Sequence, residues 1–210
     1  MARPRTFDRD EVLDRAVQLF WTQGYERTSV QDLVDSMGIQ RGSLYAAFGD
    51  KKHLFLEALD RYEQTFRGEM ERLLDGPGRA HDGIRAVFER VLHECSCDDG
   101  YKGCFMTNTA VALSEKDEDT IRRIHVNLKH MEDVFCEALQ RDATAGTLGE
   151  HQPRRLARFL TNSLQGLRVL SRCRADSDVL KDTIEVTLSL LEPTSRSRNP
   201  QLLKGVPSHG

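Results

Sequence analysis

The sequence lacks any apolar run approaching the roughly 18 residues that a membrane-spanning helix needs. It also lacks common catalytic motifs: it has no glycine-rich phosphate loop, no H-E-x-x-H, no G-x-S-x-G and no C-x-x-C. The first dozen residues are too polar for a signal peptide. We therefore expect a cytoplasmic protein that is neither an enzyme nor membrane-bound, with no cofactor and no bound metal.

Cysteine and positive charge are both limited. The five cysteines are an odd number, and in the expected reducing compartment they do not indicate a disulfide framework. The net charge of −3 gives no general excess of positive charge, so any binding of nucleic acid must depend on a local patch.

Helical periodicity extends over nearly the whole chain, and strand-like alternation is missing. Asp8 and Asp50 are expected to cap helices, and the residues Thr28 to Gln31 fit a capping box. The tail 193–210 has scattered charge and little to bury, so it is expected to be disordered. The prediction is an all-α protein with helices over 8–24, 30–38, 39–49, 50–74, 79–95, 103–114, 117–144, 153–173 and 177–191.

Three short helices within the first 49 residues form a helix-turn-helix pattern. Leu44 and Phe48 account for the inward side of the third helix, and Gly42 lets its backbone approach a surface closely. Its outward side chains with hydrogen-bond donors are Gln40, Arg41, Ser43 and Tyr45. From this pattern alone, a DNA-reading unit and a small helical bundle with solvated charges remain equally open.

Residues 24–59 read G-Y-E-R-T-S-V-Q-D-L-V-D-S-M-G-I-Q-R-G-S-L-Y-A-A-F-G-D-K-K-H-L-F-L-E-A-L. This segment closely resembles the N-terminal signature of the TetR family of bacterial transcriptional regulators. The resemblance implies a helix-turn-helix DNA-binding domain over 1–49, followed by a helical ligand-binding and dimerisation domain over 50–192. It also implies a homodimer on palindromic double-stranded operator DNA, most often a repressor released by an inducer. The alternative is a helical interaction module that no longer binds DNA, consistent with the acidic balance of charge.

The resemblance assigns roles to matching positions. Thr28, with Ser29 beside it, would contact phosphate at a helix N-terminus. Gln40 and Arg41 would approach base edges, and Lys51 would neutralise a phosphate. Family members often carry Ser where Gln40 stands, and larger side chains where this chain has two alanines, so base reading is expected to depend mainly on Gln40 and Arg41. The remaining expected contacts to phosphate or the groove wall are Gly42, Ser43 and Tyr45.

The last two helices are expected to form the dimer interface. The apolar residues on the first of them are Leu156, Phe159, Leu160, Ser163, Leu164, Leu167 and Leu170, with Gly166 permitting close contact, and those on the second are Val179, Ile184, Thr187, Leu188 and Leu191. The same faces would equally serve the core of a single chain. An unknown small molecule or electrophile is the expected inducer, and the candidate pocket residues are Tyr62, Phe66, Phe88, Phe105, Met106, Asn108, Met131, Phe135 and Phe159.

The stretch H-E-C-S-C-D-D-G-Y-K-G-C-F, residues 93–105, contains three cysteines and allows three interpretations. Its C-x-C-x₆-C pattern, with His93 and Asp98, could ligate zinc, but the spacing is not a standard zinc motif. Cys104 could instead be a reactive sensor thiol, because it lies at a predicted helix N-terminus beside Lys102, and the stretch resembles electrophile-sensing TetR members. Cys95 or Cys97 would then be resolving partners. In the third interpretation Cys104 is simply buried, as we expect for Cys136 and Cys173.

Overall fold

The computed structural model describes residues 7–76, 78–96, 102–112, 117–144, 153–173 and 176–192, and these residues form only helices and their connections. The all-α prediction is confirmed. The helices are α1 (Arg9–Gln23), α2 (Val30–Met37), α3 (Arg41–Phe48), α4 (Lys51–Leu74), α5 (Ala80–Ser96), α6 (Phe105–Ala112), α7 (Glu118–Thr144), α8 (Pro153–Arg172) and α9 (Ser177–Ser189). The tail 193–210 lies outside the described residues.

Local signals set most helix ends. The Asp8 side chain accepts hydrogen bonds from the first turn of α1, and Asp50 accepts one from the His53 amide at the start of α4. The capping box at α2 is displaced by one residue from the prediction, because Ser29 rather than Thr28 is the N-cap and Asp32 is its partner. Gly38 ends α2 in the left-handed conformation, with φ of 68°.

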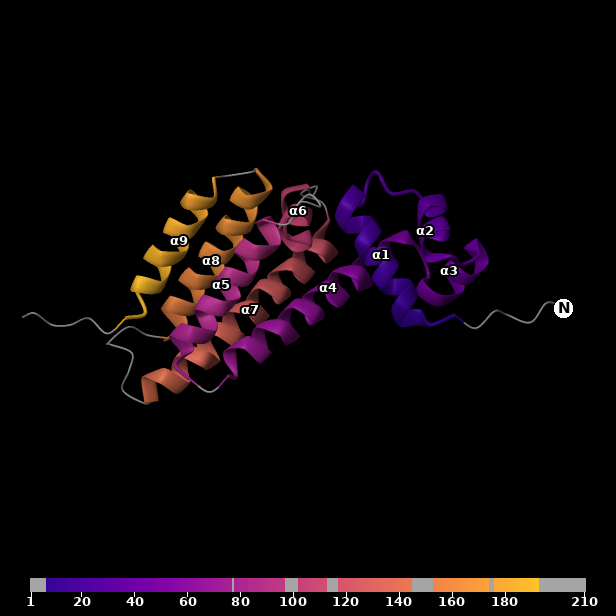
Figure 1. Cartoon of the computed structure of the whole chain (residues 1–210). Coiled ribbons are helices and arrows are strands. Elements are labelled where there is room, and N and C mark those ends of the chain that lie inside the picture. Colours follow the sequence, from indigo (N-terminus) through magenta and orange to yellow (C-terminus); the bar gives the residue numbers. More distant parts are fainter. Residues whose placement is uncertain are drawn as a thin grey trace, which may run out of the picture.

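Helix α4 connects two parts of the molecule (Figure 1). Helices α1 to α3 form an N-terminal unit around its first half. Helices α5 to α9 form a C-terminal unit, in which α7 packs along both α4 and α8, and α9 lies at the outer edge beside α5 and α8. The short helix α6 lies where the C-terminal unit comes closest to α1 (Figure 1). Each unit therefore packs against the same long helix.

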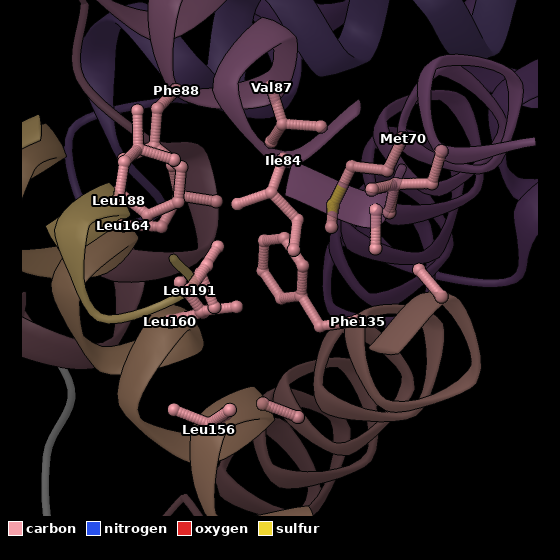
Figure 2. Close-up of a cluster of buried hydrophobic side chains, with 14 of the residues drawn as sticks. Met70, Ile84, Val87, Phe88, Phe135, Leu156, Leu160, Leu164, Leu188 and Leu191 are labelled. Atoms are coloured by element: carbon pink, nitrogen blue, oxygen red, sulfur yellow. The ribbon is translucent and has the colours of Figure 1, made fainter. Parts of the chain in front are cut away.

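Two hydrophobic clusters fill the two units. In the C-terminal cluster, Ile84 of α5 lies next to the Phe135 ring of α7, with Leu160 and Leu164 of α8 completing the centre (Figure 2). The N-terminal cluster is formed by α1 to α4, but it also includes Cys104, Phe105, Met106 and Ile124 from the C-terminal unit. The core of the N-terminal unit is therefore continuous with α6 and the start of α7.

The α6 segment begins later than the sequence predicts. The helix starts at Phe105, and the Cys104 carbonyl accepts the Asn108 amide at 2.8 Å, so Cys104 occupies the position just before the first turn. A second close approach lies between α4 and α5. A Cβ atom on Gly83 would stand 2.8 Å from the Leu73 carbonyl oxygen, so a side chain there would force the two helices apart.

Candidate nucleic-acid interface and sensor thiol

The third helix presents the side chains expected to read DNA. Arg41, Gly42 and Tyr45 are exposed, whereas Leu44 and Phe48 are buried as predicted. Gln40 occupies the N-cap position, and within the described residues its side chain makes no capping hydrogen bond, so it stays available to a ligand. Ser43 is half-buried on the same helix. The surface therefore has adjacent amide, guanidinium and phenol donors, with no side chain at position 42 to keep a partner away.

The residues that lead into α2 differ in accessibility. Ser29 is exposed, and its hydroxyl caps the helix while Asp32 accepts the Ser29 amide at 2.8 Å. Thr28 is only 1% exposed, and its hydroxyl donates to the Gly24 carbonyl at 2.7 Å. The Thr28 hydroxyl is thus already engaged inside the turn, and Ser29 is the more accessible of the two hydroxyls.

The two lysines at the start of α4 face the Tyr25 ring. The Lys51 ammonium lies 4.2 Å from the ring centroid, and the Lys52 ammonium lies 5.4 Å from it. Lys52 also forms an ion pair with Asp117 and donates to Thr120, which joins α4 to the start of α7. Burial opposes ionisation of Asp117, but Lys52 and Thr120 outweigh it and lower the pKa of that carboxyl. The base of the N-terminal unit is therefore tied electrostatically to the C-terminal unit.

The Cys104 thiol is buried next to a buried arginine. Cys104 and Arg168 are each 2% exposed, and the Arg168 guanidinium donates to the Cys104 sulfur at 3.3 Å. The guanidinium also stacks on Phe66, 3.9 Å from the ring centroid. Burial alone would raise the pKa of Cys104, but the positive charge of Arg168 and hydrogen bonds from Thr107 and Tyr62 lower it below its usual value. The Arg168 contact therefore makes the Cys104 thiol more acidic than an ordinary cysteine.

The cation beside the thiol is not the one that the sequence suggested. Lys102 points away from Cys104, because its ammonium donates to Gln18 and lies 5.6 Å from the Trp21 ring centroid. Arg168 was missed, although it interrupts an otherwise largely apolar buried stripe of α8, and a charge in such a stripe is a usable signal. Glu63 lines the same small cavity, but it interacts with His130 at 3.3 Å and Arg67 at 3.7 Å.

The residue before Cys104 holds α6 against α1. The indole Nε1 of Trp21 donates to the Gly103 carbonyl at 2.9 Å, and the Trp21 ring meets Tyr62 edge-on at 5.0 Å. Phe105, directly after Cys104, packs edge-on against Phe55 of α4. We call these contacts of Trp21, Gly103 and Phe105 the junction. Gly103 and Phe105 are the chain neighbours of Cys104, so a displacement of Cys104 must also move them and change the contacts of the junction.

The predicted pocket residues do not form one pocket. A cavity of about 20 Å³ beside Cys104 and Arg168 is lined by Tyr62, Phe66, Met106 and Met131. Phe105 and Asn108 line a different cleft, of about 520 Å³, on the other side of α6. Phe88 and Phe135 lie in the C-terminal cluster with no exposed surface, and Phe159 is exposed on α8. A groove of about 420 Å³ between α6, α7 and α8 shares Met106, Leu128 and Gln165 with the Cys104 cavity.

The other cysteine predictions have different outcomes. The Cys97 residue and the Cys95 side chain lie outside the described residues, as does Asp98, so the resolving partners and the proposed zinc ligands remain predictions. Among the described residues no cluster of three metal-ligating side chains occurs. Cys136 is buried as expected, but Cys173 is exposed in the turn after α8, so the packing role predicted for it is wrong.

The apolar faces of α8 and α9 divide into an inner and an outer part. Most of the residues expected at a dimer interface are buried in their own chain, namely Leu156, Leu160, Leu164, Leu167, Ile184, Thr187, Leu188 and Leu191. The outer part keeps exposed apolar side chains: Phe159, Val169 and Leu170 on α8, Val179 and Val186 on α9, and Leu190 directly after α9. None of the described helices combines the length and apolar character needed to cross a bilayer.

The sequence matches known protein families and individual relatives. Residues 12–58 match the family of bacterial regulatory proteins of the tetR type, and residues 80–186 match the C-terminal domain of LmrA/YxaF-like transcriptional regulators. The chain is 34% identical to the HTH-type regulator YezE of Bacillus subtilis over 91% of this chain and all of that one. It is 33% identical to the repressor ComR of Escherichia coli over 90% of both chains.

Solved structures show the same arrangement. A cysteine variant of the regulator CifR in complex with a 26-base-pair operator superposes with a TM-score of 0.80, at 30% identity, over 91% of this chain and all of that one. The reduced form of Escherichia coli NemR superposes with a TM-score of 0.79 over 85% of this chain and 94% of that one. At 19% identity, the NemR match supports the fold alone.

Proposed function

The chain belongs to the TetR family of bacterial transcriptional regulators, and we propose that it is a homodimeric repressor whose release from DNA is controlled at Cys104. As a DNA-binding regulator it is not an enzyme. In this proposal residues 1–49 bind a palindromic operator, residues 50–192 sense and dimerise, and the protein acts in the cytoplasm. The observation that carries the thiol control is the Cys104–Arg168 contact, one residue from the bond that holds α6 to α1.

For DNA binding, we assign base contacts to Gln40, whose side chain makes no capping hydrogen bond to the described residues, and to the exposed Arg41 on α3. Tyr45, which is 44% exposed, and Ser43 would contact phosphate or the groove wall, and Gly42 would allow close approach. Ser29 and the backbone amides near Thr28 would bind phosphate at the N-terminus of α2. Lys51 would contribute a positive charge beside them. The operator complex of the CifR variant supports this use of the fold.

For dimerisation, we assign the outer faces of α8 and α9. Phe159 and Leu170 on α8, Val186 on α9 and Leu190 at its C-terminal end expose apolar surface that a second copy would cover. No described atom lies within 4 Å of a Cβ placed on Gly166, so its surface is open to a close helix contact from a partner. A two-fold dimer would place the recognition helices in successive major grooves about 34–36 Å apart.

For thiol control, the chemistry follows from the buried pair. The Arg168 charge favours the Cys104 thiolate, which attacks electrophiles that neutral thiols do not. An alkylating reagent such as iodoacetamide would form a sulfur–carbon bond as its carbon–iodine bond breaks, releasing iodide and leaving the thiol proton in solvent. The adduct would need more room than the cavity of about 20 Å³ provides. The displaced segment includes Gly103 and Phe105, so the strain would reach α1 and α4 through the junction.

In this proposal, reagents reach the buried thiol from a neighbouring groove. The groove between α6, α7 and α8 is separated from the Cys104 cavity by Met106, Leu128 and Gln165, which line both. The Gln165 side chain is held in the partition because it accepts from the Thr107 hydroxyl at 2.6 Å and donates to the Met131 sulfur at 3.2 Å. Movement of the three side chains that line both spaces would open the cavity to the groove. The same groove would admit an unreactive small-molecule inducer.

A mobility-shift assay with the DNA upstream of the protein's own gene tests the proposal. We expect the wild type to shift this DNA, and Arg41→Ala to lose binding while remaining dimeric by size-exclusion chromatography. Arg155→Ala, an exposed arginine on α8, is the matched control and should bind normally. N-ethylmaleimide should release DNA from the wild type but not from Cys104→Ser. If no DNA is bound even at low salt, the alternative of an interaction module without DNA binding is correct.

A further inference from the structure

The cleft of about 520 Å³ on the α1 side of α6 has no role in the thiol mechanism. Its walls come from the end of α1 and the turn after it, from α6, and from the end of α8. Its volume lies within the range of about 300–1,000 Å³ that is typical of small-molecule sites. Cys104 does not line this cleft, because the thiol faces Arg168 on the other side of the segment. We call it the junction cleft.

Interlocked aromatic rings make the apolar wall of the junction cleft. Phe55 packs edge-on against both Phe20 and Phe105, with ring centroids 5.1 and 5.8 Å apart, and it lies 4.8 Å from the Tyr25 ring. Phe20, Phe55 and Phe105 are buried, so their rings are fixed by packing before any ligand arrives. Trp21 lines the same cleft. A rigid wall of rings suits a flat aromatic ligand, because little side-chain entropy is lost on binding.

Positive charge predominates at the polar edge of the junction cleft. Within the described part of the chain, neither Arg172 nor Arg27 has an ion-pair partner, and Arg27 donates to the Gln23 carbonyl. Lys102 lies above the Trp21 ring, outside the residues that line the cleft, and its ammonium donates to Gln18. Two carboxylates occur among the described residues that line the cleft, namely Glu26 and Asp117, and Asp117 is paired with Lys52. An anion is therefore favoured over a cation at this edge.

From the aromatic wall and the unpaired cations, we propose that the junction cleft binds an aromatic anion, such as a fused-ring carboxylate or sulfonate. The ring system would lie against Trp21 and Phe105, and the anionic group would pair with Arg172. The Arg172 side chain is well placed, because its stem lies against Gly103, 3.2 Å from where a Cβ on that glycine would stand. The ligand would contact α1, α6 and α8 at once, so it would be bound at the junction without any covalent step.

A matched pair of fluorescent probes tests this with the full-length protein. 8-Anilinonaphthalene-1-sulfonate is an aromatic anion, and N-phenyl-1-naphthylamine has the same rings without the sulfonate. Trp21 is the only tryptophan of the chain, so a probe bound in this cleft must quench its emission, and the variants below locate the site. We expect saturable binding of the anion with quenching of Trp21, and binding at least about tenfold weaker for the neutral probe.

Two matched pairs of variants locate the site. Arg172→Gln should weaken the anion about tenfold and leave the neutral probe within about twofold, while Arg155→Gln on the same helix should change neither. Ala112→Phe, which fills the cleft, should weaken both probes, while Ala110→Phe, which faces the other groove, should change neither. Circular dichroism checks that each variant keeps its helix content.

Three results would contradict the proposal. Binding that saturates without quenching Trp21 would put the probe elsewhere and overturn the proposal. Equal losses in Arg172→Gln and Arg155→Gln would reveal general attraction to positive charge, and unchanged binding in Ala112→Phe would exclude the cleft. The titration contains no DNA, and Cys104→Ser should bind both probes as the wild type does. The result is therefore independent of whether Cys104 controls operator release.

Discussion

Carbamidomethylation of Cys104 should weaken operator binding, and the size of this effect follows from the space around the sulfur. The sulfur is 2% exposed and borders a cavity of about 20 Å³, which has room for about one water molecule. The acetamide group brings four heavy atoms, so the surrounding side chains must move. Overpacking of this kind costs about 1–3 kcal/mol in protein cores. If that strain opposes the DNA-competent arrangement, operator affinity falls by about 5- to 150-fold.

The assay compares operator affinity before and after alkylation. The protein is treated with iodoacetamide until mass spectrometry shows complete modification of Cys104, and fluorescence anisotropy with the upstream DNA gives Kd. Cys104→Ser, treated in the same way, controls for reaction at the other cysteines, of which Cys173 is exposed. A fully modified protein whose Kd stays within about twofold of the untreated one would refute the proposed coupling between the thiol and the junction.

Three further predictions concern the thiol, the junction and the fold. Arg168→Met should raise the pH midpoint of Cys104 alkylation, because the cation that stabilises the thiolate is gone and burial then opposes ionisation; rates measured by mass spectrometry across pH test this, and an unchanged midpoint contradicts it. Trp21→Phe removes the donor to the Gly103 carbonyl and should lower the free energy of unfolding by about 1 kcal/mol in urea denaturation; an unchanged midpoint and slope would argue against the bond. Gly83→Ala should destabilise the protein by about 1–3 kcal/mol, because its Cβ would meet the α4 backbone; a gain in stability, as helix propensity alone predicts, would show that the two helices separate freely.

Local interactions explain which parts of the fold were predictable. Helix periodicity and capping involve residues within about four positions of each other, so Asp8, Asp50 and Gly38 marked helix ends that the structure confirms. The errors were small shifts in the same local features, such as the cap at Ser29 instead of Thr28. The inward positions Leu44 and Phe48 also followed from helical spacing, because a short amphipathic helix has one apolar face to bury.

The division of α8 and α9 into inner and outer faces was not predictable from the sequence. Leu164 and Leu170 have the same chemistry, but Leu164 is fully buried in the C-terminal cluster and Leu170 is 41% exposed. Which side of an amphipathic helix meets its own chain depends on where the neighbouring helices lie. The wide apolar face predicted both a core and a dimer surface, and only the packing of α5 and α7 separates the two.

The sequence by itself determined an all-α chain, its helix boundaries to within a few residues, the recognition helix and the family. It also singled out Cys104, but it chose Lys102 as the neighbouring cation because that residue is close along the chain. Only the tertiary structure decided that Arg168, 64 positions from Cys104, lies against the sulfur, and that Trp21 donates to Gly103, 82 positions away from it. Contacts over such distances arise from the packing of whole helices against one another, and no local pattern of residues specifies which side chains will meet.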